Sequence, residues 1–107
     1  MITIHIRYTG APGAARVFAE EMTASGTAAA IRAETGSLRY EYYIPMEDPE
    51  TVLLIDSWAD QAALDAHHAS PIMGVVAALR EKYDLHMSVE RYVSAADAPE
   101  DEKFIRK

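Results

Sequence analysis

Hydrophobic and polar residues alternate along four segments of the chain, and this alternation predicts four β-strands. Successive side chains of a strand point to opposite faces, so a period of two indicates an element with one apolar and one polar face. The first segment shows the pattern most clearly, with isoleucine at every second position from Ile2 to Ile6. The predicted strands run from Ile2 to Tyr8, Ser37 to Ile44, Thr51 to Trp58 and Leu85 to Val93.

Apolar residues at helical spacing predict a helical region after the first strand. The spacing i, i+3, i+4, i+7 is met by Ala15, Phe18, Ala19 and Met22. Gly26 interrupts this helix, because glycine costs about 1 kcal/mol in a helix interior. A short helix from about Thr27 to Glu34 follows, and Gly36 suits the left-handed residue that ends it.

A second helical region, also interrupted once, is predicted between the third and fourth strands. Asp60 is the expected N-cap of a helix that reaches Ala69, and Ser70-Pro71 is expected to begin the next helix. That helix turns Arg80, Glu81 and Lys82 away from an apolar stripe. The stripe consists of Ile72, Val75, Val76, Leu79 and Tyr83.

This order of elements predicts an α+β fold of the ferredoxin-like βαββαβ type, with an antiparallel four-stranded sheet. Helices can cover only one face of such a sheet. We expect the other face to carry an apolar row from every strand, so its burial against a second copy predicts a homodimer. Residues 1–93 are the expected domain, and residues 94–107 a tail that is flexible or docks on the partner through Phe104-Ile105.

Composition narrows the function classes. The chain has 107 residues, which is about one domain, and its net charge of −7 lacks the positive footprint of a protein that binds nucleic acid or anionic membranes. There is no cysteine, which excludes disulfides, thiolate catalysis and cysteine-ligated metal. No apolar run approaches the roughly 20 residues of a membrane span, and no basic-then-apolar leader is visible, so a cytoplasmic location is expected.

His67 and His68 are candidate general bases, because an imidazole accepts a proton near neutral pH. Neighbouring helical residues point about 100° apart, so the two rings cannot face one ligand equally. They follow Leu64 by three and four residues, so at least one of them faces inward. A histidine beside a core is more often structural than catalytic, and both interpretations stay open. Metal binding is disfavoured, since neither this spacing nor an H-E-x-x-H motif supports it.

Trp58 is either a stacking wall for a flat aromatic substrate or the largest piece of the core. Asp56 shares its face by the period of two, and a carboxylate among apolar neighbours must find a partner. His5, Arg7 or His67 could supply that partner, and a carboxylate behind a histidine orients the ring as in other general bases.

Tyrosines are dense on the second predicted strand. Tyr40 and its neighbours Tyr42 and Tyr43 either line a pocket and offer hydroxyls to a quinone or phenol oxygen, or pack across strands at a dimer face. His5 and Arg7 are polar residues of a strand expected near the centre of the sheet, which makes them candidates for substrate contact.

Three motifs in this order resemble the antibiotic biosynthesis monooxygenase family, including its quinol-monooxygenase branch. They are the Gly-x-x-x-Tyr strand from Gly36 to Tyr40, the acidic-x-Trp strand end Asp56-Ser-Trp58, and the helix Ala63-Leu-Asp-Ala-His67 followed by Ser70-Pro71. The resemblance covers about residues 2–93.

The resemblance implies a dimeric α/β barrel that oxidises a phenol, a hydroquinone or a polyketide-derived aromatic compound with O₂, without metal or flavin. It implies His67 as catalytic base or hydrogen-bonding partner, Trp58 as wall, and Tyr40 or His5 on substrate oxygens. The remaining expected substrate contacts are Asp56, His68 and Arg7.

The chain departs from the family in two places, and two other functions stay open. Ile72 stands where many quinol-monooxygenase-like relatives have a second histidine, and no histidine occurs between Ile72 and Leu85, where haem-degrading relatives have their axial ligand.

One alternative function is that of an isomerase or signal-processing enzyme acting on a small polar carbonyl compound, for which Arg7 and Arg39 would matter. The other is a non-catalytic dimer that binds a hydrophobic ligand.

Overall fold

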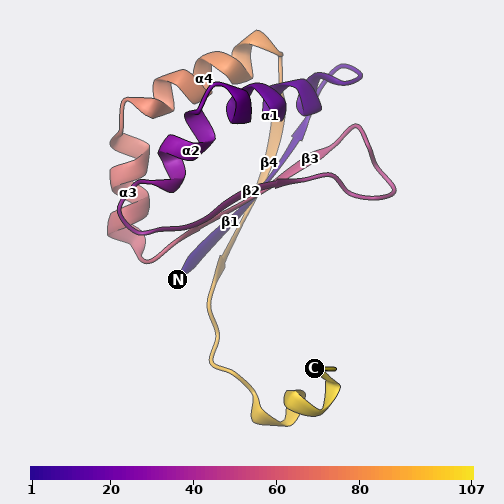
Figure 1. The fold of residues 1–107 in the computed structure, drawn as a ribbon, viewed down its shortest axis with the longest axis vertical. Helices are drawn as coiled ribbons and strands as arrows, with labels where there is room; N and C mark the ends of the chain where they lie inside the picture. Colours follow the sequence, from indigo (N-terminus) through magenta and orange to yellow (C-terminus); the bar gives the residue numbers. More distant parts are fainter.

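The computed structural model describes residues 1–107 and shows a four-stranded antiparallel sheet with helices packed on one face (Figure 1). The strand order is β2-β3-β1-β4. The strands are β1 (Ile2–Thr9), β2 (Ser37–Tyr43), β3 (Val52–Trp58) and β4 (His86–Val93). The helices are α1 (Ala14–Ala24), α2 (Thr27–Arg32), α3 (Gln61–Ala69) and α4 (Ile72–Lys82). The predicted ferredoxin-like fold is confirmed, and each predicted element is present within a few residues of its expected bounds.

The core lies between the helices and the inner face of the sheet, the face that the helices cover. Residues opposite each other in an antiparallel pair share a face. The apolar row of β1 therefore lies beside the row of β3 that ends at Trp58. The largest fully buried side chains are Trp58, Tyr8, Phe18, Met22, Ile31, Leu54 and Leu64.

Local signals at the helix ends act as the sequence predicts. The Asp60 carboxylate accepts a hydrogen bond from the Ala63 amide at 2.9 Å, and the Ser70 hydroxyl accepts one from the Ile72 amide at 3.3 Å. Gly36 has a φ of 80°, the left-handed conformation that favours glycine. A Cβ at Gly36 would lie 2.5 Å from that of Ala63, so the turn before β2 packs closely on α3.

The outer face of the sheet, which no helix covers, differs from the prediction. Only β3 contributes an apolar pair there, Leu53 and Ile55; the other strands present mainly polar or charged residues and two tyrosines. The expected apolar row from every strand is wrong, because the apolar residues of β1 and β4 face the helix side. The polar outer residues include Thr3, His5, Arg7, Arg39, Glu41, Ser88 and Glu90.

Some apolar residues of the helix side remain exposed, because β4 is an edge strand that the helices do not cover. Met87, Val89 and Val93 are 41%, 54% and 72% exposed. Val75 of the predicted α4 stripe is also exposed, while Val76 is buried.

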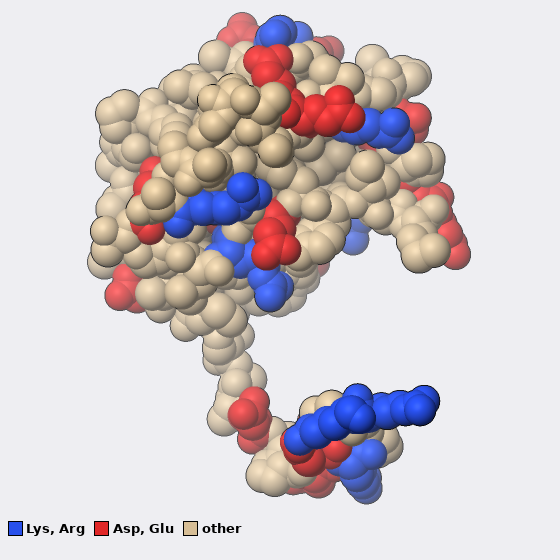
Figure 2. Space-filling model, in the orientation of Figure 1, with Lys and Arg blue, Asp and Glu red and all other residues tan.

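Residues 94–107 extend away from the body and contain one short 3₁₀ helix, Pro99–Phe104 (Figure 1). Figure 2 shows acidic and basic side chains interspersed on both the tail and the body. Phe104 and Ile105 are exposed. No helix of the chain is long and apolar enough to cross a bilayer.

Candidate functional site

Trp58 and His67 form a stacked pair beneath α3. Trp58 ends β3, and only two residues separate it from the first turn of α3, whose inward positions are Leu64 and His67. The ring centroids of Trp58 and His67 are 4.6 Å apart and the planes are inclined by 23°. His67 is 4% exposed and Trp58 is fully buried, so the indole fixes the imidazole from one side.

The carboxylate partner of His67 is Glu34. Its Oε2 atom lies 2.6 Å from Nδ1 of His67. Asp56 was the predicted carboxylate partner of His67, and Glu34 was not predicted. The structure pairs Asp56 with Trp58 and with none of His5, Arg7 and His67. Glu34 comes from the turn that Gly36 packs against α3, a contact between segments 33 residues apart. Glu34 and His67 line a cleft of about 220 Å³ beside α3.

Asp56 lies at the edge of the Trp58 ring and accepts a hydrogen bond from its indole N–H at 2.5 Å. The side chain is 5% exposed. Burial raises the pKa of Asp56 to about 6, although the hydrogen bond from Trp58 and the charges of His67 and Arg80 act in the opposite direction. Asp56 can therefore exchange a proton near neutral pH.

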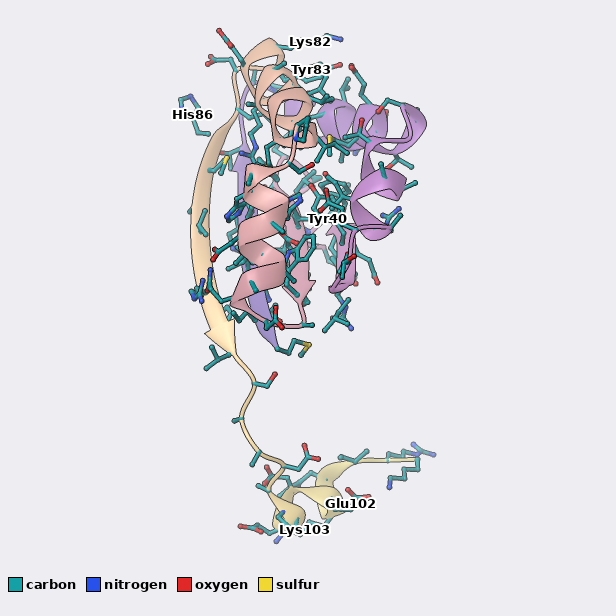
Figure 3. The ribbon with its side chains drawn as sticks, turned by 90° about the vertical axis from the view of Figure 1, so that its left-hand side faces the viewer. Tyr40, Lys82, Tyr83, His86, Glu102 and Lys103 are labelled. Carbon is teal, nitrogen blue, oxygen red and sulfur yellow. The ribbon has the colours of Figure 1, made fainter.

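Three buried or half-buried tyrosines, Tyr8, Tyr40 and Tyr42, share the inner face of the sheet with this carboxylate. Tyr40 stands opposite Asp56 in the β2–β3 ladder, and its hydroxyl accepts a hydrogen bond from that of Tyr42 at 3.3 Å. Figure 3 shows Tyr40 between the helices and the sheet. Burial raises the pKa of Tyr8, Tyr40 and Tyr42, so these phenols remain protonated donors at neutral pH.

Arg80 brings a cation to the same cluster. Its Nη2 atom donates to the Tyr8 hydroxyl at 2.9 Å, and its guanidinium lies 5.5 Å from the centre of that ring. The Nε atom is buried and has no hydrogen-bond partner. The sequence pattern placed Arg80 on the outward side of α4, which is wrong: the side chain is half-buried, because its long stem reaches back over the sheet.

The other candidate residues lie apart from this cluster. His68 is exposed, with its ring 5.7 Å from that of His67, and burial and the His67 charge lower its pKa. His5 and Arg7 are on the outer face of the sheet, where His5 packs against Tyr92 at 4.9 Å. The structure thus brings together His67, Trp58, Asp56 and Tyr40, and leaves His5 and Arg7 on the opposite side. No group of three or more His, Cys, Asp or Glu residues is arranged to hold a metal ion.

Comparison with known families shows which family the chain belongs to. The family model of the antibiotic biosynthesis monooxygenases matches residues 1–79, which include β1, β2, β3, α3 and most of α4. The chain belongs to the antibiotic biosynthesis monooxygenase family. The family match includes all the clustered residues except Arg80, which lies one position beyond it. A search of curated proteins found no match.

Solved structures of the same fold cover nearly the whole chain. A Deinococcus radiodurans protein suggested to belong to this family has a TM-score of 0.78 at 18% identity, covering 92% of this chain and 96% of its own. PA3566 from Pseudomonas aeruginosa is 27% identical, with a TM-score of 0.73 and coverage of 89% and 94%. SnoaB from Streptomyces nogalater, a cofactor-independent oxygenase, has a TM-score of 0.74 at 19% identity, covering 92% and 96%.

Proposed function

We propose that this protein is a cofactor-independent monooxygenase that oxidises a small aromatic phenol or hydroquinone with O₂. The observation that carries the proposal is the unit of Glu34, His67, Trp58 and Asp56, in which His67 stacks on the indole of Trp58 and Asp56 accepts its N–H. Family membership and the likeness to SnoaB, which is a cofactor-independent oxygenase, support an oxygenase role.

The first step is removal of a hydroxyl proton from the substrate. His67 is the proposed acceptor, since the contact of its Nδ1 atom with Glu34 fixes the ring and leaves Nε2 for the proton. Asp56 is a second acceptor within the cluster, because burial holds its pKa at about 6, much closer to neutrality than an exposed aspartate. Trp58 is fully buried, and its role in this proposal is to hold the His67 ring in place by stacking.

The resulting anion reduces O₂ directly. One electron passes from the electron-rich ring to O₂, the two radicals combine at a ring carbon, and the peroxide formed loses water to leave a carbonyl group. For a hydroquinone of formula C₁₀H₈O₂ the balance is C₁₀H₈O₂ + O₂ → C₁₀H₆O₃ + H₂O. In this proposal the guanidinium of Arg80, whose Nε–H has no partner, stabilises the anion before oxygen adds.

We also propose that the chain works as a homodimer. The support is the exposed apolar row of β4, formed by Met87, Val89 and Val93, and the exposed Phe104-Ile105 pair in the tail. Light scattering of the full chain at micromolar concentration should give twice the chain mass of 11.8 kDa. A monomeric mass would refute the dimer and leave the oxygenase proposal standing.

O₂ consumption with a panel of hydroquinones and polycyclic phenols tests the proposed activity. We expect uptake above the autoxidation rate, with His67→Ala reducing it by about 10²-fold or more, the usual contribution of a general base. His86→Ala is the matched control, because His86 is exposed at the outer margin of β4, away from Tyr40 (Figure 3). Full activity in His67→Ala would exclude His67 as the base, and the same assay on Asp56→Asn would then test the second acceptor.

A further inference from the structure

A groove on the flank of α1 lies apart from the stacked pair of Trp58 and His67. Its volume is about 430 Å³, the largest of the hollows in the structure and within the roughly 300–1,000 Å³ of small-molecule sites. We call it the α1 groove. Its walls come from α1, the end of β2 and the start of β3, and include Ala19, Thr23, Ala24, Tyr42, Ile44 and Val52.

The walls of the α1 groove suit a neutral, flat and largely apolar molecule. The Tyr42 ring stands beside small aliphatic side chains, and Tyr43, whose ring turns to the outer face of the sheet, lines the rim of the groove. Tyr43 and Ile44 remain 40% and 43% exposed, so a bound ring would remove apolar surface from water. The only charged groups are Arg16 and Glu20, one of each sign, so the groove favours neither an anion nor a cation.

Tyr42 gives the α1 groove a polar contact of defined direction. Its hydroxyl donates to the hydroxyl of Tyr40, so its oxygen remains free to accept a hydrogen bond. A ligand that carries an O–H group matches this acceptor. Tyr40 in turn stands opposite Asp56 in the β2–β3 ladder, so the hydrogen-bonded pair of phenols lies on the same face of the sheet as the buried carboxylate.

We propose that the α1 groove binds a neutral, flat aromatic molecule whose hydroxyl group donates a hydrogen bond to Tyr42. The ring lies against Tyr42 and the small aliphatic side chains of the groove, and the hydroxyl extends the hydrogen bond that runs from Tyr42 to Tyr40. That this ligand is the oxidised substrate rests on the proposed function with Asp56, the second acceptor, in place of His67, whereas the binding itself does not.

Binding of 2-naphthol to the full chain tests the proposal without oxygen chemistry. This probe is neutral at pH 7 and carries one hydroxyl donor, and 2-methoxynaphthalene is its counterpart without a donor. Amide chemical shifts in a ¹H–¹⁵N spectrum locate the site, and titration gives the Kd. Ala24→Trp fills the groove, and Ala29→Trp is the matched control on an exposed position of α2 that does not line it.

We expect 2-naphthol to shift amides of α1 and of residues 42–44, with Ala24→Trp weakening binding at least tenfold and Ala29→Trp leaving it unchanged. Tyr42→Phe should weaken 2-naphthol binding by about three- to tenfold, the effect of one hydrogen bond, and leave 2-methoxynaphthalene unaffected. Shifts confined to the cleft of Glu34 and His67, or equal affinity in Ala24→Trp, would overturn the proposal. A Kd that rises with protein concentration would also overturn it, by showing that a second copy covers the groove.

Binding of 2-naphthol together with absent O₂ uptake would refute the proposed function and keep the α1 groove as a ligand site. Uptake of O₂ that is unchanged by Ala24→Trp would refute the groove as the substrate site and keep the oxygenase.

Discussion

Asp56 should make the protein less stable at neutral pH than in mild acid, and Asp56→Asn should remove this dependence. The carboxylate is 5% exposed and its pKa is about 6, against an ordinary value of 3.8. Between these two values the folded chain holds a proton that the unfolded chain has released. Stability from this group is therefore present at low pH and is lost as the pH rises toward 6.

The magnitude follows from the two pKa values. Their difference corresponds to about 3 kcal/mol of unfolding free energy at 1.36 kcal/mol per unit, and about 2 kcal/mol of this is lost between pH 4.5 and pH 7.5. Asparagine is neutral throughout this range, and its side-chain oxygen can still accept the hydrogen bond from Trp58. Between pH 4.5 and pH 7.5, the unfolding free energy of Asp56→Asn should thus rise by about 2 kcal/mol relative to that of the natural chain.

Urea unfolding at several pH values, followed by the fluorescence of Trp58, measures this difference. Trp58 is the only tryptophan and reports directly on the neighbourhood of Asp56. Other titrating groups affect both proteins, so the difference between the two curves isolates the one carboxylate. A difference that stays constant from pH 4.5 to 7.5 would refute the assignment of a raised pKa to Asp56.

Three further predictions concern neighbouring residues. Gly36→Ala should destabilise the chain by about 2–4 kcal/mol in urea unfolding, because the φ of Gly36 is 80° and the new Cβ would lie 2.5 Å from that of Ala63. Gly74→Ala is the control: its Cβ would meet no atom within 4 Å, so this substitution should be neutral or stabilising. Glu34→Gln should lower kcat about tenfold or more with little change in substrate Kd, because the substitution loosens the His67 ring. An unchanged kcat would contradict this prediction. Arg80→Met should raise the pKa of Asp56 further, because the positive charge of Arg80 lowers that pKa. The pH titration of Trp58 fluorescence should therefore move to higher pH, and a shift to lower pH would contradict this prediction.

The fold could be predicted from the sequence because its signals are local. The alternation in β1, the Asp60 cap and the left-handed Gly36 each depend on a few neighbouring residues, and all three were predicted correctly. The outer face of the sheet was predicted wrongly. Alternation shows that a strand has two faces, but it does not show how the rows of separate strands align. The register of β1 with β4 decides that alignment.

The candidate site could be predicted only in part, for the same physical reason. Trp58 and Asp56 were placed on one face correctly by the period of two, whereas Tyr40 was a separate candidate that the register of β2 with β3 sets opposite Asp56. Glu34 and Arg80 were missed as members of the cluster. Glu34 reaches His67 through the packing of a turn on α3, and Arg80 reaches Tyr8 across 72 positions of the sequence. Helical periodicity gives the direction of a Cβ atom, and it does not show where a long side chain ends.

The most direct test of the oxygenase proposal is the fate of oxygen atoms during turnover under oxygen-18 gas. With a hydroquinone that the full chain oxidises, mass spectrometry should show one labelled atom in each product molecule formed within the first minutes, and no label in a parallel reaction with labelled water and ordinary O₂. A product without label from the gas, formed together with one equivalent of hydrogen peroxide, would mean that the protein only transfers electrons to O₂. That result would contradict its assignment as a monooxygenase.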